Sequence, residues 1–231
     1  MKTITVLALL FASPFGYAQC LHATKDQLGT DASGMLRGLR DAPRGMIKPQ
    51  NLVWELPVAA ATGALIAAGD TPVARKVSGA HTLNSDSDTA STAITDLMIG
   101  SAGIIYLAGC ASEHNHALRA GISTLAATGF AVLSDEVLKY SFDRERPFKN
   151  NGNGDFWVGG NSFPSGHTVA AWAVASALAH SYPQKRWVKW TAYAAATGVA
   201  ALRITAHEHF PSDVIIGGTL GFTIGDRLGH P

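Results

Sequence analysis

The sequence predicts an all-α protein, a compact helical bundle of about six core helices. Three observations support this class. Apolar residues make up 47% of the 231-residue chain, 24 glycines accompany abundant alanine in the apolar runs, and patterns typical of strands are scarce. Small residues let helices pack closely, and a chain of this length can bury a sizeable core as one domain.

The apolar runs place the expected helices at residues 52–68, 92–111, 116–140, 167–181, 186–205 and 212–226. Asp70-Thr71-Pro72 is expected to end the first helix, because proline disrupts a helix interior. The polar, Ser- and Asp-rich segment 71–91 is expected to be a loop. Residues 19–50, which contain scattered glycines and arginines, are predicted to form an irregular arm that precedes a helical domain of residues 51–231.

The first 18 residues are typical of a secretory signal peptide. Lys2 gives a positive start, an apolar run follows, and residues 16–18 form a small-x-small cleavage site. We therefore expect an exported protein, periplasmic or extracellular, with an uncleaved anchor as the alternative. In an oxidising compartment Cys20 and Cys110 could pair, although one pair at this separation is a weak signal.

The net charge and the lengths of the charge-free runs indicate which partners the chain can have. The net charge of +1 gives no support for a nucleic-acid partner. A membrane-spanning helix needs about 20 predominantly apolar residues. The charge-free runs are bounded by Asp96 and Glu113, Arg119 and Asp135, Lys189 and Arg203, and Asp213 and Asp226. Because these runs are shorter than a span, we expect a soluble bundle that is extractable without detergent. Contact with a membrane stays open, since functional charges also occur in membrane bundles.

The polar stretch LRITAHEHFPSD, which ends at Asp213, lies between two expected helices and has the spacing Arg-x5-His-x3-Asp. Such groups are costly to bury without a function. A carboxylate near an imidazole fixes its tautomer and raises its basicity, so His209 could attack an electrophile. Arg203 could hold an oxyanion with its planar guanidinium. The alternative is a loop with an incidental polar cluster.

A second polar stretch, KYSFDRERP, follows the helix expected at 116–140. Lys139 and Arg146 are its candidate ligands for an anion, because two cations directed into one pocket repel each other unless an anion lies between them. Asp143, Arg144 and Glu145 are expected to form a solvated helix end and to pair with their neighbours.

The third stretch, SFPSGHT, opens the helix expected at 167–181. A helix N-terminus offers free N–H groups and a positive dipole end to an anion. Ser165 adds a hydroxyl donor, Gly166 allows a close approach of the backbone, and His167 could donate a proton to a leaving oxygen. The alternative is an ordinary serine cap followed by a surface histidine.

Lys-x6-Arg-Pro, Pro-Ser-Gly-His and Arg-x5-His-x3-Asp, in this order, resemble the three signature motifs of the type 2 phosphatidic acid phosphatase superfamily. That superfamily includes bacterial class A acid phosphatases and vanadium-dependent haloperoxidases. The motifs run from Lys139 to Asp213, and the helical pattern extends the likeness over most of the mature chain. Leu202 departs from the usual serine. His207 and Glu208, where small or apolar residues are common, are expected to be a loop-exposed pair.

The resemblance implies a helical bundle of the acid phosphatase and vanadium haloperoxidase type, with the site at one end. It implies that His209 attacks phosphorus to form a phosphohistidine, that Asp213 orients His209, and that His167 protonates the leaving alkoxide. The phosphate-binding groups that it implies are Lys139, Arg146, Arg203, Ser165 and the Gly166 N–H. No metal and no cofactor are implied, since the cations neutralise the charge that Mg²⁺ neutralises elsewhere.

We therefore expect an exported phosphatase of phosphomonoesters, whose substrate is a soluble ester or a lipid phosphate or pyrophosphate. A vanadium-dependent haloperoxidase and a noncatalytic phosphate-binding module are the alternatives. The chain is short for the first, and the intact His209, His167 and Asp213 argue against the second. Phe156 and Trp157, in the Gly- and Asn-rich insert before the second motif, are expected either to cap the pocket or to pack on the bundle. The oligomeric state stays open.

Overall fold

The structure is a computed structural model that describes residues 25, 29, 33, 49–112 and 115–229. Every regular element in this part of the chain is helical, which confirms the predicted all-α class. The predicted signal peptide and nearly all of the predicted arm lie outside the described residues. The elements are α3 (Pro49–Ala64), the π-helical turn η1 (Leu65–Gly69), α4 (Asp70–Val77), α5 (His81–Ala111), α6 (Asn115–Phe142), the 3-10 turn η2 (Asn150–Gly152), α7 (Gly166–Ser181), α8 (Arg186–Thr205) and α9 (Pro211–Leu228).

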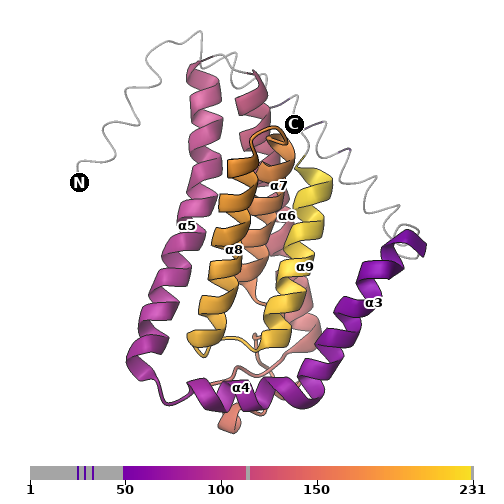
Figure 1. The fold of residues 1–231 in the computed structure, drawn as a ribbon, viewed down its shortest axis with the longest axis vertical. Coiled ribbons are helices and arrows are strands. Elements are labelled where there is room, and N and C mark those ends of the chain that lie inside the picture. The colour runs from indigo at the N-terminus through magenta and orange to yellow at the C-terminus, as the bar shows by residue number, and fades with distance from the viewer. Residues whose placement is uncertain (1–24, 26–28, 30–32, 34–48, 113–114, 230–231) are drawn as a thin grey trace.

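Helices α5 to α9 run side by side along the long axis, and α7 packs against all the others (Figure 1). Most residues of α7 are buried, and alanine dominates its sequence. Glycines on α9 allow a close contact between α7 and α9. A Cβ atom on Gly221 would lie 2.2 Å from the carbonyl oxygen of Val169, and one on Gly225 would lie 2.4 Å from that of Ala173.

The predicted loop at residues 71–91 is wrong. Helix α4 begins at Asp70 and α5 begins at His81, so only three residues separate the two helices. Pro72 lies in the first turn of α4, where the helix makes no use of a backbone N–H. Two serines of this segment, Ser87 and Ser91, lie on a face of α5 that meets polar groups of α8. Ser87, for example, is buried and accepts a hydrogen bond of 2.9 Å from Thr205.

Three helical segments within the described ranges are long and apolar enough to cross a membrane: Leu56–Val77, His81–Ala111 and Asn115–Phe142. Large apolar side chains on them are exposed, among them Leu97, Ile104, Leu133 and Val137. These features indicate a membrane-associated protein and favour the membrane contact left open above over the expected soluble bundle. The charge-free runs counted in the sequence end at single charged residues. Helix α5, which has 31 residues, nevertheless keeps a long apolar stretch beyond its charged first half.

Helix α4 crosses one end of the bundle, and α3 leans away from it (Figure 1). At the end that α4 crosses, α5, α7 and α9 begin and α6 and α8 end. The first motif follows α6, the second opens α7, and the third joins α8 to α9. The fold therefore gathers three stretches that are distant in sequence.

Candidate active site

His209 lies in the turn between α8 and α9 and is buried. Its Nδ1 lies 2.7 Å from the backbone carbonyl oxygen of Ser162. Because a carbonyl can only accept a hydrogen bond, Nδ1 carries the proton and Nε2 keeps a free lone pair. Burial lowers the pKa of His209; Asp213 opposes this shift, and the charges of Arg203 and Arg146 add to it. The imidazole is therefore neutral near pH 7, the form that a nucleophile requires.

Asp213 lies in the first turn of α9 and is fully buried. Its Oδ2 accepts hydrogen bonds from the Phe210 N–H at 2.9 Å and from the Ser162 hydroxyl at 2.6 Å. The same oxygen lies 3.7 Å from Nδ1 of His209. Asp213 is thus close enough to stabilise a charged imidazole, while the hydrogen bond that fixes the ring goes to Ser162. The role of Ser162 has no local signal in the sequence, because only the fold brings its carbonyl oxygen to His209.

Arg144 is buried, with 1% of its side chain exposed. Its Nη1 donates to Oδ1 of Asp213 at 2.5 Å, and its Nη2 donates to Oδ2 of Asp70 at 2.8 Å. The guanidinium also lies between the rings of Phe210 and Phe156, 4.1 and 4.6 Å from their centroids. The prediction that Arg144 is solvated and pairs with its sequence neighbours is wrong. Its carboxylate partners lie 69 and 74 positions away, so local spacing gave no signal.

The two aromatic residues of the insert differ in their surroundings. Phe156 packs edge-to-face on Phe142 and Phe163, with centroid distances of 6.2 and 5.8 Å, in addition to its contact with Arg144. Trp157 is 73% exposed, and its Nε1 donates to the Ser141 carbonyl oxygen at 3.2 Å. Of the two expectations, packing on the bundle holds for Phe156.

Ser165 immediately precedes α7 and is buried. Its backbone N–H donates to the Asp213 carbonyl oxygen at 3.2 Å, which joins the second motif to the third. Its Oγ accepts a hydrogen bond from the Thr168 hydroxyl at 3.0 Å. The hydroxyl proton of Ser165 therefore remains available to an anion at the start of α7, together with the first N–H groups of the helix.

Lys139 and His167 flank the start of α7. A Cβ atom on Gly166 would lie 2.9 Å from Lys139 Nζ and 2.8 Å from Asp135 Oδ2, so the ammonium group lies directly against this backbone. Lys139 Nζ donates to Asp135 at 2.5 Å. His167 Nε2 lies 3.2 Å from the Thr92 hydroxyl of α5.

Arg146 and Arg203 both lie against the carboxylate of Glu208, which was expected to be exposed to solvent. Glu208 Oε2 pairs with Arg146 Nη1 and lies 3.5 Å from Arg203 Nη2. The side chain of Glu208 is 22% exposed, and His207 is half-buried. The expectation of a loop-exposed pair is therefore wrong. The same turn that presents His209 also presents Glu208 to the arginines.

All the predicted site residues thus lie at the end of the bundle that α4 crosses. His209 and Asp213 are linked through Ser162, Ser165 bonds to Asp213, and Lys139 lies against Gly166. Burial and the positive charge of Arg203 lower the pKa of His167, and burial and the charges of Arg203 and Arg146 lower that of His209. The arrangement places cations and a helix N-terminus around a neutral imidazole, which suits a phosphoryl group.

We expect Gly166→Ala to lower kcat/KM by up to about 10²-fold, because its methyl group would push Lys139 from the start of α7. Gly129→Ala is the matched control, since a Cβ atom at Gly129 meets nothing within 4 Å. Steady-state kinetics on both variants in detergent micelles checks this. Equal kcat/KM for the two variants would show that Lys139 does not need its position against Gly166.

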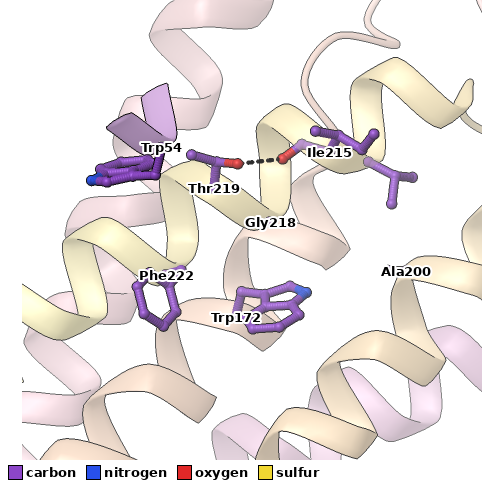
Figure 2. A pocket seen from close by; sticks show the side chains of 8 residues that line it. Trp54, Trp172, Ala200, Ile215, Gly218, Thr219 and Phe222 are labelled. Carbon is purple, nitrogen blue, oxygen red and sulfur yellow. Dashed lines mark hydrogen bonds between the residues drawn. The ribbon is translucent and has the colours of Figure 1, made fainter. Parts of the chain in front are cut away.

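An apolar pocket of about 370 Å³ adjoins this end of α9. Figure 2 shows Trp54 of α3, Trp172 of α7 and Phe222 of α9 around it. The Thr219 hydroxyl is turned to the Ile215 carbonyl oxygen at 2.8 Å, so it leaves the lining apolar (Figure 2). Val214, directly after Asp213, also lines the pocket.

A more polar pocket of about 530 Å³ lies between α4 and the chain after α6. It is lined by Arg75, Ser78, Pro147, Phe148, Asn151, Gly152 and His207. Pro147 directly follows Arg146, and His207 directly precedes Glu208. One apolar and one polar cavity thus adjoin residues of the motifs.

Residues 120–226 match the family model of the PAP2 superfamily. This stretch contains all three motifs, so the resemblance to the type 2 phosphatidic acid phosphatases is confirmed. Over 107 residues, 45% of this chain, the sequence is 35% identical to a lipid A 1-phosphatase from Porphyromonas gingivalis. The chain covers only 22% of that relative's length.

Two solved structures are similar in fold. A transmembrane PAP2-type phosphatidylglycerolphosphate phosphatase from Bacillus subtilis is 25% identical, with a TM-score of 0.52 over 73% of this chain and 89% of that one. LpxE from Aquifex aeolicus is 23% identical, with a TM-score of 0.46 over 68% and 93% of the two chains. The first similarity confirms a bundle of the predicted type.

Proposed function

We propose that this protein is a membrane-associated phosphatase that hydrolyses phosphomonoesters of lipids through a phosphohistidine intermediate. The observation that carries the proposal is the fixed tautomer of His209, whose Nε2 lone pair is free while Nδ1 donates to Ser162. The signal-like first 18 residues support export, with the reaction on the far side of the membrane.

In the proposed reaction, Nε2 of His209 attacks phosphorus, and the bond from phosphorus to the ester oxygen breaks. His167 donates a proton to the departing alkoxide. Asp213, 3.7 Å from Nδ1, stabilises the positive charge on the imidazole. Water then attacks phosphorus, the bond from phosphorus to Nε2 breaks, His167 takes the proton of the water, and inorganic phosphate leaves. The nonbridging oxygens are held by Lys139, Arg146, Arg203, the Ser165 hydroxyl and the Gly166 N–H.

The two pockets support an amphipathic substrate. The apolar pocket between α3 and α9 has the size and lining for part of an acyl chain, and Val214 connects it to Asp213. The polar pocket adjoins Arg146 through Pro147 and suits a hydroxylated head group. The names of the relatives, a lipid A 1-phosphatase and a phosphatidylglycerolphosphate phosphatase, agree with a lipid phosphate.

A substrate panel tests this proposal. We expect phosphate release from phosphatidic acid and phosphatidylglycerol phosphate in mixed micelles at a kcat/KM at least about tenfold above that for glycerol phosphate, since the chain in the apolar pocket adds binding energy. EDTA should leave the rate unchanged, and vanadate should inhibit competitively, because the cations bind the oxyanion. A preference for the soluble ester would contradict a lipid substrate. Loss of activity in EDTA would contradict metal independence, and halide oxidation in vanadate would favour a haloperoxidase.

A further inference from the structure

The carboxylate of Glu208 occupies a position between two proposed phosphate ligands. One oxygen, Oε2, pairs with Nη1 of Arg146 and lies 3.5 Å from Nη2 of Arg203. Carboxylate and phosphate oxygens present the same acceptors to a guanidinium. A phosphoryl group held by both arginines would need the donors that Glu208 uses. It would also bring two negative charges against each other.

The surroundings of the two arginines allow Glu208 to leave. Arg203 also pairs with Asp88 and donates to the Ser91 hydroxyl at 3.1 Å, and Arg146 donates to Asn161 at 2.7 Å. Each arginine therefore keeps a partner without Glu208. Arg203 further has a buried Nε with no hydrogen-bond partner among the described residues, which is a donor left for an incoming anion.

Glu208 itself can move without unfolding the turn. Its backbone N–H and that of His209 donate to the Arg203 carbonyl oxygen at 3.4 and 3.3 Å, so the main chain stays attached to α8. Its side chain is 22% exposed, and that of Arg146 is 23% exposed. Rotation of the side chain alone would carry the carboxylate toward solvent, where it recovers its hydration.

We propose that Glu208 is an internal competitor for the phosphate position: it pairs with Arg146 and Arg203 in the empty site and is displaced when a phosphoryl group binds. This inference rests on the proposed function, which makes the two arginines phosphate ligands. Glu208 weakens the binding of every phosphate species that needs both arginines, the product included. It thereby favours release of inorganic phosphate and sets the substrate concentration at which the site fills.

The test compares Glu208→Gln with the wild-type protein in detergent micelles. Glutamine keeps the size of the side chain and removes the charge that competes with phosphate. We expect Kd for inorganic phosphate, measured by equilibrium binding, to fall about tenfold, and the competitive inhibition constant for vanadate to fall with it. KM should fall for lipid phosphates, and kcat should stay level or fall as product release slows.

Asp226→Asn is the matched control, since it removes one negative charge from the C-terminal part of α9, away from the motifs. It should leave phosphate binding unchanged. Equal or weaker phosphate binding by Glu208→Gln, with wild-type unfolding, would overturn the inference and assign Glu208 a structural role. If Glu208→Gln binds phosphate more tightly while the wild type cleaves no ester, the inference stands and the proposed function fails. Glu208→Ala provides a second variant, in which Kd for inorganic phosphate should also fall.

Discussion

His209→Ala should abolish turnover, with a loss in kcat of about 10³-fold or more, and should remove all covalently bound phosphate. The reason is that His209 has the form that a nucleophile requires: Nδ1 is fixed by Ser162, and Nε2 is left free. The measurement is acid-quench trapping of phosphoenzyme from a substrate with labelled phosphate. Label retained by His209→Ala would show that another residue is the nucleophile.

His167→Ala is the comparison variant for this experiment. An acid that protonates the leaving oxygen typically accelerates bond cleavage by about 10²–10⁴-fold. An activated leaving group such as nitrophenolate departs with little protonation, so its cleavage gains little from the acid. We therefore expect His167→Ala to form phosphoenzyme readily from nitrophenyl phosphate and slowly from an alkyl ester. Equal losses for both esters would contradict the role of His167 as the acid.

The pH profile gives an independent check on His209. Burial is the main cause that lowers its pKa, so the neutral nucleophilic form persists below the ordinary histidine value of 6.5. Since protonation removes the nucleophile, the acidic limb of kcat/KM should lie below pH 6.5 and not above it. The measurement needs a substrate that is fully ionised over the pH range used. An acidic limb of kcat/KM at or above pH 6.5 would then contradict a buried neutral His209.

Arg144→Met should lower the free energy of unfolding by about 3–5 kcal/mol. Arg144 is the shared cation of Asp70 and Asp213, and each of these carboxylates is no more than 1% exposed. Methionine fills a similar apolar volume between Phe156 and Phe210 but leaves two buried carboxylates without their cation. The measurement is thermal unfolding followed by far-ultraviolet circular dichroism in detergent micelles.

Arg146→Met is the matched control, because it removes an arginine two positions away that is 23% exposed. Ion pairs of this exposure contribute about 1 kcal/mol or less, so Arg146→Met should unfold near the wild-type temperature while it loses activity. Arg144→Lys keeps the charge but cannot donate to both carboxylates in the same geometry. Its unfolding temperature should lie between those of the wild type and Arg144→Met. If Arg144→Met and Arg146→Met unfold at the same temperature, the structural role of Arg144 is wrong.

The sequence by itself determined the helical class and the residues that carry the three motifs. Alanine- and glycine-rich apolar runs predict close-packed helices whatever their arrangement, and the motif spacings identify Lys139, His167 and His209 without coordinates. Each of these signals lies within a short stretch of sequence, where the spacing of residues determines which side chains share a helix face or a turn. The same locality explains why five of the six expected helices kept their approximate positions. It also explains why the partners of Arg144, directly after α6, were not predicted.

Only the tertiary structure decided which polar groups meet across the chain. Arg144 reaches Asp70 and Asp213, and Glu208 reaches Arg146, over separations of 62 to 74 residues. At the level of the sequence each of these charges is as compatible with solvent as with a partner, because the cost of burial depends on what the fold brings alongside. Segment 71–91 is largely helical for the same reason: Ser87, Asp88 and Ser91 contact Thr205 and Arg203 of α8, and that contact, not local propensity, stabilises the helix there.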